Sequence, residues 1–267
     1  MKFAFDHDLH IHSHLSICST DEGQTPAALL EYAKHNNLKQ ICVTDHYWDS
    51  AVPCNTGVNW WYEKQNFEHI SSDLPLPKAE GVDFLFGCEA DMDSDNRIGL
   101  PKSRYDDFDF IIVSTTHFHH MCGEKWEDIS HEGVARRWFD RMYAVLDSDL
   151  PFHKVGIAHP ACKLMNRASR EDYLLTLDAM SDEALYRVYK KAAEVGVGIE
   201  LNSDDFKFDE NEADRILRMF KIAKDCGCKF YLGSDAHTRG GFNGKNEAFE
   251  GIITLLDLRE CDKFHIR

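Results

Sequence analysis

The stretch DLHIHSH at residues 8–14 ends the first apolar segment of the chain with three histidines, His10, His12 and His14. On an extended strand, residues i and i+2 point to the same face. His10 and His12 can therefore reach one metal ion, while Ile11 packs in the opposite direction. The alternative is a solvated, histidine-rich loop, and the rest of the chain distinguishes between these two interpretations.

Short apolar segments alternate with amphipathic ones along the chain. After residues 8–12, six further stretches have the length and composition of buried strands: QICVTDH (40–46), DFLFGCEAD (83–91), DFDFIIVSTTH (107–117), KVGIAHP (154–160), VGIEL (197–201) and CKFYLGSDAH (228–237). Helical patterns occupy residues 25–37, 125–149 (with a break expected at Gly133), 181–196, 211–227 and 247–259. This alternation predicts parallel strands that are joined by crossover helices.

Polar side chains that suit metal ions stand at the carboxyl end of almost every predicted strand. After His10 and His12, these are Asp45, His46, Glu89, Asp91, His117, His159, Glu200, Asn202, Asp235 and His237. Closing parallel strands into a barrel brings these ends to one face, where barrel enzymes place their active sites. Converging imidazoles and carboxylates are costly to desolvate unless cations pair with them. We therefore expect an α/β barrel with a multinuclear metal centre, rather than an open sheet.

The same residues carry a resemblance to a known family. The motifs HIH (10–12), TDH (44–46), GCEAD (87–91), HF (117–118), IAHP (157–160) and GSDAH (233–237) resemble the motif series of the PHP (polymerase and histidinol phosphatase) family, in particular its stand-alone, histidinol-phosphatase-like members. These motifs follow one another over nearly the whole chain. The resemblance implies a distorted (β/α)7 barrel of the PHP type, and we expect one domain over residues 1–267.

The resemblance also implies a centre of two to three divalent transition metal ions, drawn from zinc, manganese and iron. By motif, the implied ligands are His10, His12, His46, Glu89, His117, His159, Asp235 and His237, with Glu89 bridging two ions. The family places one more ligand shortly after the HxH pair, and Asp21 fits the register with the helix start at Thr25–Pro26. Glu22, Cys18 and His14 are the alternatives. Glu200 and Asn202 are expected to orient the metal-binding side chains rather than to bind a metal ion themselves.

The activity that the resemblance implies is phosphoester hydrolysis by a metal-bound hydroxide. Asp235, Glu89 and His237 are the candidate catalytic residues. Asp235 would orient or deprotonate the attacking water, whereas His237 is better assigned as a ligand.

Four further residues are candidates for substrate binding, because they lie in loops predicted on the active face. Lys163, Arg167 and Arg239 have the charge that phosphate recognition requires, and His119 follows the strand that ends at His117. For the three cationic residues the alternative is an ordinary surface residue, and for His119 the alternatives are an extra metal ligand and a plain loop residue. The aromatic-rich stretch 47–67 forms either a lid over the site or a loop packed on the barrel.

Composition restricts the class of protein. The formal net charge of -16 repels phosphate backbones and argues against nucleic acid as a partner. The chain has no run of 18 apolar residues, so we expect no membrane span. The first residues lack the apolar core of a signal peptide, which favours a cytoplasmic location. Nine cysteines, an odd number without a CxxC pair, argue against a disulfide framework.

The sequence therefore predicts a metal-dependent phosphatase that acts on a small phosphorylated metabolite, with histidinol phosphate as one candidate. The alternatives are a PHP phosphodiesterase or nuclease, a non-catalytic metal-binding PHP module, and a metalloamidase. A nuclease is disfavoured because the chain has no basic groove pattern. Retention of about eight ligands favours an enzyme over a module.

Overall fold

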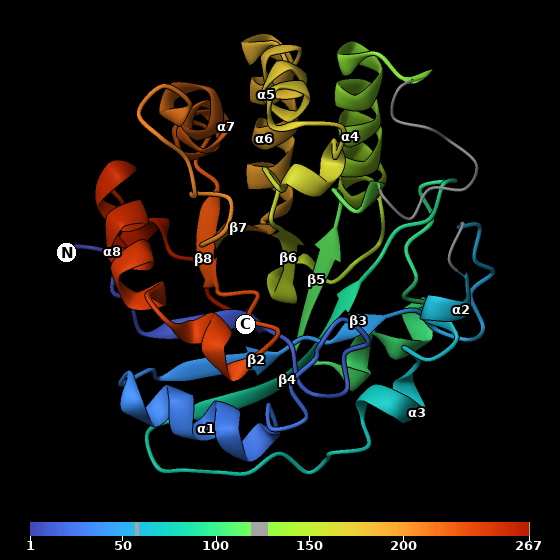
Figure 1. Cartoon of the computed structure of the whole chain (residues 1–267), viewed down its shortest axis with the longest axis vertical. Helices are drawn as coiled ribbons and strands as arrows, with labels where there is room; N and C mark the ends of the chain where they lie inside the picture. Colours follow the sequence, from blue (N-terminus) through green and yellow to red (C-terminus); the bar gives the residue numbers. More distant parts are fainter. Residues whose placement is uncertain (57–58, 119–127, 267) are drawn as a thin grey trace.

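A parallel sheet curls nearly into a barrel, with the longer helices on its outside (Figure 1). The computed structural model describes residues 1–56, 59–118 and 128–266. Within them, the strands run in the order β1 (His7–Ile11), β2 (Gln40–Val43), β4 (Asp83–Ala90), β5 (Phe110–Ser114), β6 (Val155–Ala158), β7 (Gly198–Asn202) and β8 (Lys229–Gly233). The two-residue strand β3 (His46–Tyr47) pairs with β4. This arrangement confirms the predicted barrel and all seven predicted strands.

The first and last strands meet and nearly close the barrel. The backbone N–H of Asp235 donates to His10 O (2.8 Å), and that of His12 donates to Ala236 O (3.2 Å). The buried carboxylate of Asp8 accepts a hydrogen bond from Ser234 N (2.9 Å). These bonds hold the ends of β1 and β8 together, and both ends carry predicted ligands.

Six helices of nine or more residues pack around the described part of the barrel. They are α1 (Pro26–His35), α4 (His131–Leu146), α5 (Arg170–Asp178), α6 (Asp182–Val195), α7 (Ala213–Asp225) and α8 (Lys245–Leu255), and two single-turn helices, α2 (Asn59–Tyr62) and α3 (Phe67–Ile70), lie in the loop after β3. Thr25 and Ser181 cap α1 and α6 as their sequences predict. Helix α6 ends at Gly196, whose φ of 80° suits glycine.

Two details of the helices differ from the sequence prediction. Gly133 does not break a helix, because it lies in the first turn of α4, where its N–H donates to the capping side chain of Ser130 (3.1 Å). Helix α5 was not predicted. It begins after Ser169, whose hydroxyl accepts from Asp172 N (3.0 Å), and its apolar pattern is weak.

Alternate strand residues pack on opposite faces of the sheet. On β5, Phe110 and Ile112 belong to a small cluster with Leu9, Ala158 and Tyr231. Their neighbours Ile111 and Val113 belong to the large core that includes the helices. This period of two is the one that a strand requires.

Two structural findings bear on the expectations from composition. The eight cysteines of the described residues are free thiols. Among the same residues, no helix is long and apolar enough to cross a bilayer.

Candidate metal centre

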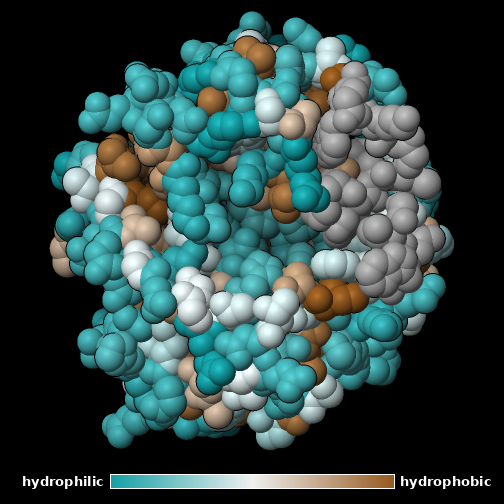
Figure 2. Space-filling view, in the orientation of Figure 1, coloured by the Kyte–Doolittle hydropathy of each residue, from teal (hydrophilic) through white to brown (hydrophobic). Residues whose placement is uncertain are grey.

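The side chains at the strand ends converge on a buried cluster. Those of His10, His12 and Glu89 are 0% exposed, although all three are ionisable. His46, His117 and His159 lie beside them and are also buried. On the face shown in Figure 2, the molecule is hollowed near its centre, and the visible side chains there are hydrophilic. The strand-end pattern therefore brings the predicted ligands together.

The first group of ligand atoms comes from His10, His12 and Asp235. The Nε2 atoms of the two histidines lie 3.2 Å apart. Asp235 Oδ1 lies 3.0 Å from His12 Nε2 and 3.4 Å from His10 Nε2. The other nitrogen of His10, Nδ1, donates to Glu200 Oε1 (2.9 Å), so its Nε2 lone pair faces His12 and Asp235. A cation bound by His10 Nε2, His12 Nε2 and Asp235 Oδ1 would remove the repulsion between the lone pairs of the two nitrogens.

Glu89 lies between the groups and contacts histidines through both oxygens. Its Oε1 is 2.9 Å from His159 Nε2 and 3.8 Å from His117 Nε2. Its Oε2 is surrounded by the nitrogens of His46 (3.0 Å), His12 (3.5 Å) and His10 (3.6 Å). Yet this buried oxygen accepts no hydrogen bond. A buried carboxylate oxygen normally has such partners, so Glu89 fits the position of a ligand that bridges two cations.

Asp91 holds two of the histidines in place, a role that the sequence did not reveal. Its Oδ1 accepts from His117 Nδ1 (2.6 Å) and its Oδ2 accepts from His46 Nδ1 (3.1 Å). Each imidazole therefore keeps Nε2 for a metal ion, and the carboxylate increases its basicity. The available signal was the spacing of Asp91 two residues after Glu89, on the same side of an extended chain.

Glu200 acts from the opposite side of the cluster. Besides its bond to His10, its Oε2 accepts from the backbone N–H of His159 (2.6 Å). A Cβ at Gly233 would overlap Glu200 Oε1, so only glycine fits at the end of β8. Asn202 Nδ2 donates to Glu200 Oε1 (3.2 Å) and to Asp235 Oδ2 (3.3 Å). Glu200 and Asn202 thus orient His10, His159 and Asp235 through hydrogen bonds.

The structure does not bring Asp21 to the cluster. Its carboxylate is bound by the backbone N–H (3.0 Å) and guanidinium (2.9 and 3.0 Å) of Arg239. Glu22 is exposed, and His14 Nε2 pairs with Asp73 Oδ2 (2.7 Å). Of the four alternatives, the described structure groups only Cys18 with histidines, namely His12, His46 and His237. The structure therefore does not support the choice of Asp21 as the additional metal ligand, because Arg239 already neutralises its carboxylate.

Neighbouring charges shift the pKa of several groups in the cluster. Burial alone raises the pKa of Asp235, but the imidazoles of His10 and His12 outweigh it and hold this pKa well below its usual range. Burial lowers the pKa of His159, but the Glu89 carboxylate raises it to about 9. Burial opposes ionisation of Cys18, yet His46 and His237 lower the pKa of its thiol to about 7. Asp235 and Cys18 are thus held toward the anionic forms that bind cations.

Two residues of the cluster have a left-handed backbone. The φ angle is 27° at His159 and 52° at Asp235. This region is uncommon for residues other than glycine, although aspartate tolerates it better than most. Hydrogen bonds from the backbone N–H of each residue, to Glu200 and to His10, fix these conformations. Backbone strain of this kind is typical of functional sites.

Comparison with known proteins agrees with this geometry. A family model described as the PHP domain matches residues 8–204. The chain belongs to the PHP domain family. Two relatives named "Probable phosphatase" are similar to it: that of Caldicellulosiruptor saccharolyticus is 25% identical over 86% of this chain and 80% of that protein, and that of Vibrio campbellii is 26% identical over 86% and 76%. The expected family is thereby confirmed.

The fold is shared with a solved PHP-type structure. Histidinol phosphate phosphatase from Lactococcus lactis, complexed with zinc, L-histidinol and phosphate, superposes with a TM-score of 0.59 at 15% identity, covering 97% of this chain and 94% of that chain. This likeness confirms the PHP-type barrel. The names of the two relatives agree with the predicted enzyme class, a phosphatase.

The predicted substrate-binding residues of this PHP domain lie in different surroundings. Lys163 lines a cavity of about 260 Å³ that also reaches His159 and Asp235. Arg167 is exposed, and Arg239 is already bound to Asp21. His119 lies outside the described residues. Of the three predicted residues that are described, Lys163 alone lines a cavity that also reaches the cluster.

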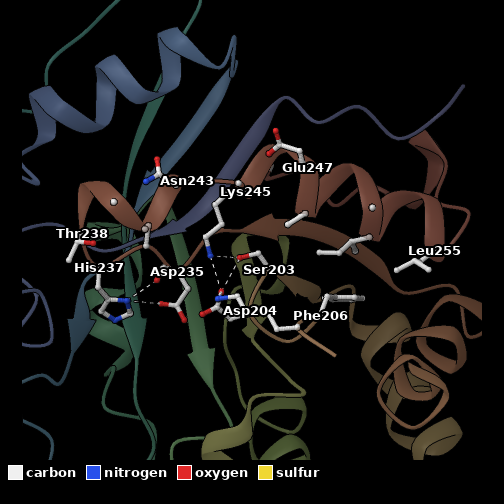
Figure 3. A pocket seen from close by; sticks show the side chains of 18 residues that line it. Ser203, Asp204, Phe206, Asp235, His237, Thr238, Asn243, Lys245, Glu247 and Leu255 are labelled. Atoms are coloured by element: carbon white, nitrogen blue, oxygen red, sulfur yellow. Dashed lines mark hydrogen bonds and ion pairs between the residues drawn. The ribbon is translucent and has the colours of Figure 1, made fainter. Parts of the chain in front are cut away.

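A larger cavity, of about 600 Å³, begins at Asp235 and His237 and follows helix α8 (Figure 3). Near the cluster its wall is polar: Lys245 Nζ bonds to Ser203 Oγ, to Asp204 Oδ1 (3.0 Å) and to Ser234 O (2.8 Å). Phe206 and the exposed Leu255 lie farther along it. No sequence motif marked Lys245, because only its burial in the fold sets it apart from a surface lysine.

The described residues of the aromatic stretch 47–67 pack on the barrel and also reach the cluster. Trp48 and Tyr62 are buried, and their ring centroids lie 5.1 Å apart, so they pack the loop onto the PHP barrel. The ring of Trp61 meets that of His46 edge-on, with centroids 6.0 Å apart. This indole thus covers one side of the cluster.

Proposed function

We propose that this chain is a metal-dependent phosphatase that hydrolyses a small phosphomonoester at a centre of two to three divalent transition metal ions. The observation that carries the proposal is Glu89 Oε2, a buried carboxylate oxygen without a hydrogen bond among three imidazole nitrogens. Zinc, manganese and iron suit such a set of imidazoles and carboxylates. Histidinol phosphate is a candidate substrate, since the Lactococcus lactis structure contains zinc, L-histidinol and phosphate.

The residues of the cluster would divide between the ions as their distances suggest. His10, His12 and Asp235 would hold one ion and His117 and His159 a second, with Glu89 bridging the two. Such ions supply Lewis acidity, which activates water at neutral pH and neutralises phosphate oxygens. Asp235, which lines both cavities, would orient the attacking water and accept its proton. His237 lines the larger cavity and, like Cys18, offers a ligand atom close to one of His46.

We take residues 1–267 as a single domain, although the family model ends at residue 204. Strand β8 pairs with β7 along five residues and meets β1. Asp235 and His237 directly follow it. A shorter unit would lack two of the proposed ligands and leave the barrel open.

The test of the proposal is a metal analysis combined with turnover of p-nitrophenyl phosphate on the same sample, purified without chelator. We expect about two to three equivalents of transition metal and turnover that a chelator removes and added zinc, manganese or iron restores. Less than one equivalent, not restored by any of these ions, would contradict the metal centre. Full metal content without turnover would favour the phosphodiesterase, the amidase or the non-catalytic module.

The cavity along α8 is proposed to hold the organic group of the substrate, and Gly251 tests this. A Cβ at Gly251 meets no other atom within 4 Å, so a side chain there enters the cavity without displacing the core. We expect Gly251→Phe to raise KM about tenfold for histidinol phosphate, a loss of about 1.4 kcal/mol, with little change for methyl phosphate, whose organic group is a single methyl. The matched control, Gly251→Ala, adds one methyl group and should change neither. Equal effects of phenylalanine on both substrates would place the organic group elsewhere.

A further inference from the structure

The ammonium group of Lys245 is buried beside the cluster and has no part in the chemistry described so far. Lys245 is 8% exposed, whereas a lysine is seldom buried so deeply without a specific partner. We propose that Lys245 is a positioning residue for Asp235: by holding the backbone oxygen of Ser234, it fixes the peptide that precedes Asp235 and hence the place of the Asp235 carboxylate. This inference rests on the proposed function, because Asp235 would orient the attacking water.

The three N–H donors of the Lys245 ammonium are all used within the protein. They bond to the hydroxyl of Ser203, to Asp204 Oδ1 (3.0 Å) and to the backbone oxygen of Ser234 (2.8 Å). In Figure 3 the Lys245 side chain extends from α8 toward Ser203 and Asp204, next to Asp235. Because no N–H of this ammonium is left for a phosphate oxygen, Lys245 has the contacts of a residue that holds the site rather than the substrate.

The peptide between Ser234 and Asp235 is held at both of its polar atoms. Its oxygen accepts from Lys245 Nζ, and its N–H donates to the backbone oxygen of His10 (2.8 Å). A peptide unit is planar, so bonds at its two opposite sides fix its orientation. That orientation sets the φ angle of Asp235, which has the uncommon value of 52°. Loss of the bond to the oxygen would let the peptide rotate toward a more usual backbone conformation.

The residue before this peptide is anchored separately. The buried carboxylate of Asp8 accepts from the backbone N–H of Ser234 (2.9 Å) and from the hydroxyl of Tyr32 (3.0 Å). The freedom that remains is rotation of the next peptide, which Lys245 restricts from the side of the cavity. With this peptide fixed, Asp235 Oδ1 lies 3.0 Å from His12 Nε2 and Oδ2 accepts from Asn202 (3.3 Å).

The first measurement is steady-state kinetics of Lys245→Met with p-nitrophenyl phosphate and saturating metal ions. Methionine keeps most of the side-chain volume but has no N–H to donate. We expect kcat to fall about 10- to 100-fold, the usual effect of losing a partner that orients a functional side chain. KM should stay within about twofold of the wild type, because the ammonium has no N–H free for the substrate.

A double mutant separates positioning from a general structural role. If Lys245 acts through Asp235, its substitution has little further effect once the Asp235 carboxylate is absent. We therefore expect Lys245→Met combined with Asp235→Asn to have a kcat within about twofold of that of Asp235→Asn alone. A substitution that merely loosens the fold would lower kcat by the same factor in both backgrounds.

The second measurement does not depend on activity. Amide hydrogen exchange of metal-depleted protein reports whether the bond from Asp235 N to His10 O persists. We expect exchange in residues 233–237 to be at least about tenfold faster in Lys245→Met, with exchange in α6 unchanged. The two readouts together test the peptide and its functional consequence.

Lys263→Met is the matched control for both measurements. Lys263 is 6% exposed and pairs with Asp6 Oδ1 (3.0 Å) and Glu260 Oε1 (2.9 Å), so its removal also deletes a buried ammonium with carboxylate partners. It lies beside Phe230, near the start of β8 and away from Asp235. This variant should leave kcat and the exchange of residues 233–237 as they are in the wild type.

The outcomes separate this inference from the proposed function. Equal losses of kcat in the two backgrounds, a higher KM at unchanged kcat, or unchanged exchange in residues 233–237 would each overturn the role of Lys245. A wild-type protein without metal or turnover would overturn the proposed function, and the exchange measurement would still test the positioning. Lys245→Gln, whose amide nitrogen ends one bond short of the lysine nitrogen, repeats both measurements should the methionine variant not fold.

Discussion

Glu89→Gln is expected to lower phosphatase turnover by about 10³-fold and to reduce the bound metal, while the barrel stays folded. The substitution keeps the shape of the side chain but replaces one oxygen by an amide NH₂ group, which cannot act as a ligand. It also removes the carboxylate that lies within 3.0 Å of both His46 and His159. Two ions would thereby lose their shared ligand.

The measurement is metal content and kcat on the same purified sample, with circular dichroism to verify the fold. Glu183→Gln is the matched control, because Glu183 lies on the outer helix α6 with a side chain that is 80% exposed. Its metal content and turnover should equal those of the wild type. Retention of full turnover in Glu89→Gln would show that the bridging position is assigned to the wrong residue.

The strands and their ends were predictable because they depend on local pattern. A short apolar run followed by histidine or a carboxylate, as in QICVTDH, marks both a buried strand and its carboxyl end. Once the strands are parallel, the geometry of a barrel brings those ends together without further information. Glu89, His117 and His159, which are separated widely along the chain, meet for this reason.

The loops were not predictable in the same way, because no period governs their path. Asp21 has the charge of a ligand and a plausible register, but the sequence does not show that Arg239, 218 residues later, binds its carboxylate. Nothing in the sequence around Cys18 distinguishes it from the other cysteines. Yet the turn after β1 places its sulfur beside His46 and His237. Helix α5 was missed because it is only nine residues long and Leu175 points to solvent, which weakens its apolar pattern.

Asp235→Asn is expected to reduce kcat by about 10²- to 10³-fold, with at most a partial loss of metal. Asparagine retains Oδ1, which lies 3.0 Å from His12 Nε2, but it cannot accept the proton of the attacking water. It also tolerates the left-handed backbone, with φ of 52° at this position, so the local conformation should persist. Alanine would add about 1–2 kcal/mol of backbone strain, so the effect of that strain could not be separated from the loss of the carboxylate.

Asp257→Asn is the matched control, since Asp257 has the same left-handed backbone (φ 44°) but lies on the surface between Lys224 and Arg259. This variant should keep wild-type turnover and metal content. The metal content of Asp235→Asn then separates the two roles that the geometry allows. Low turnover with full metal content assigns Asp235 to the water, whereas loss of one ion assigns it mainly to the site of His10 and His12. Turnover within about threefold of the wild type would exclude both roles, because a group that holds the reacting water contributes far more than that.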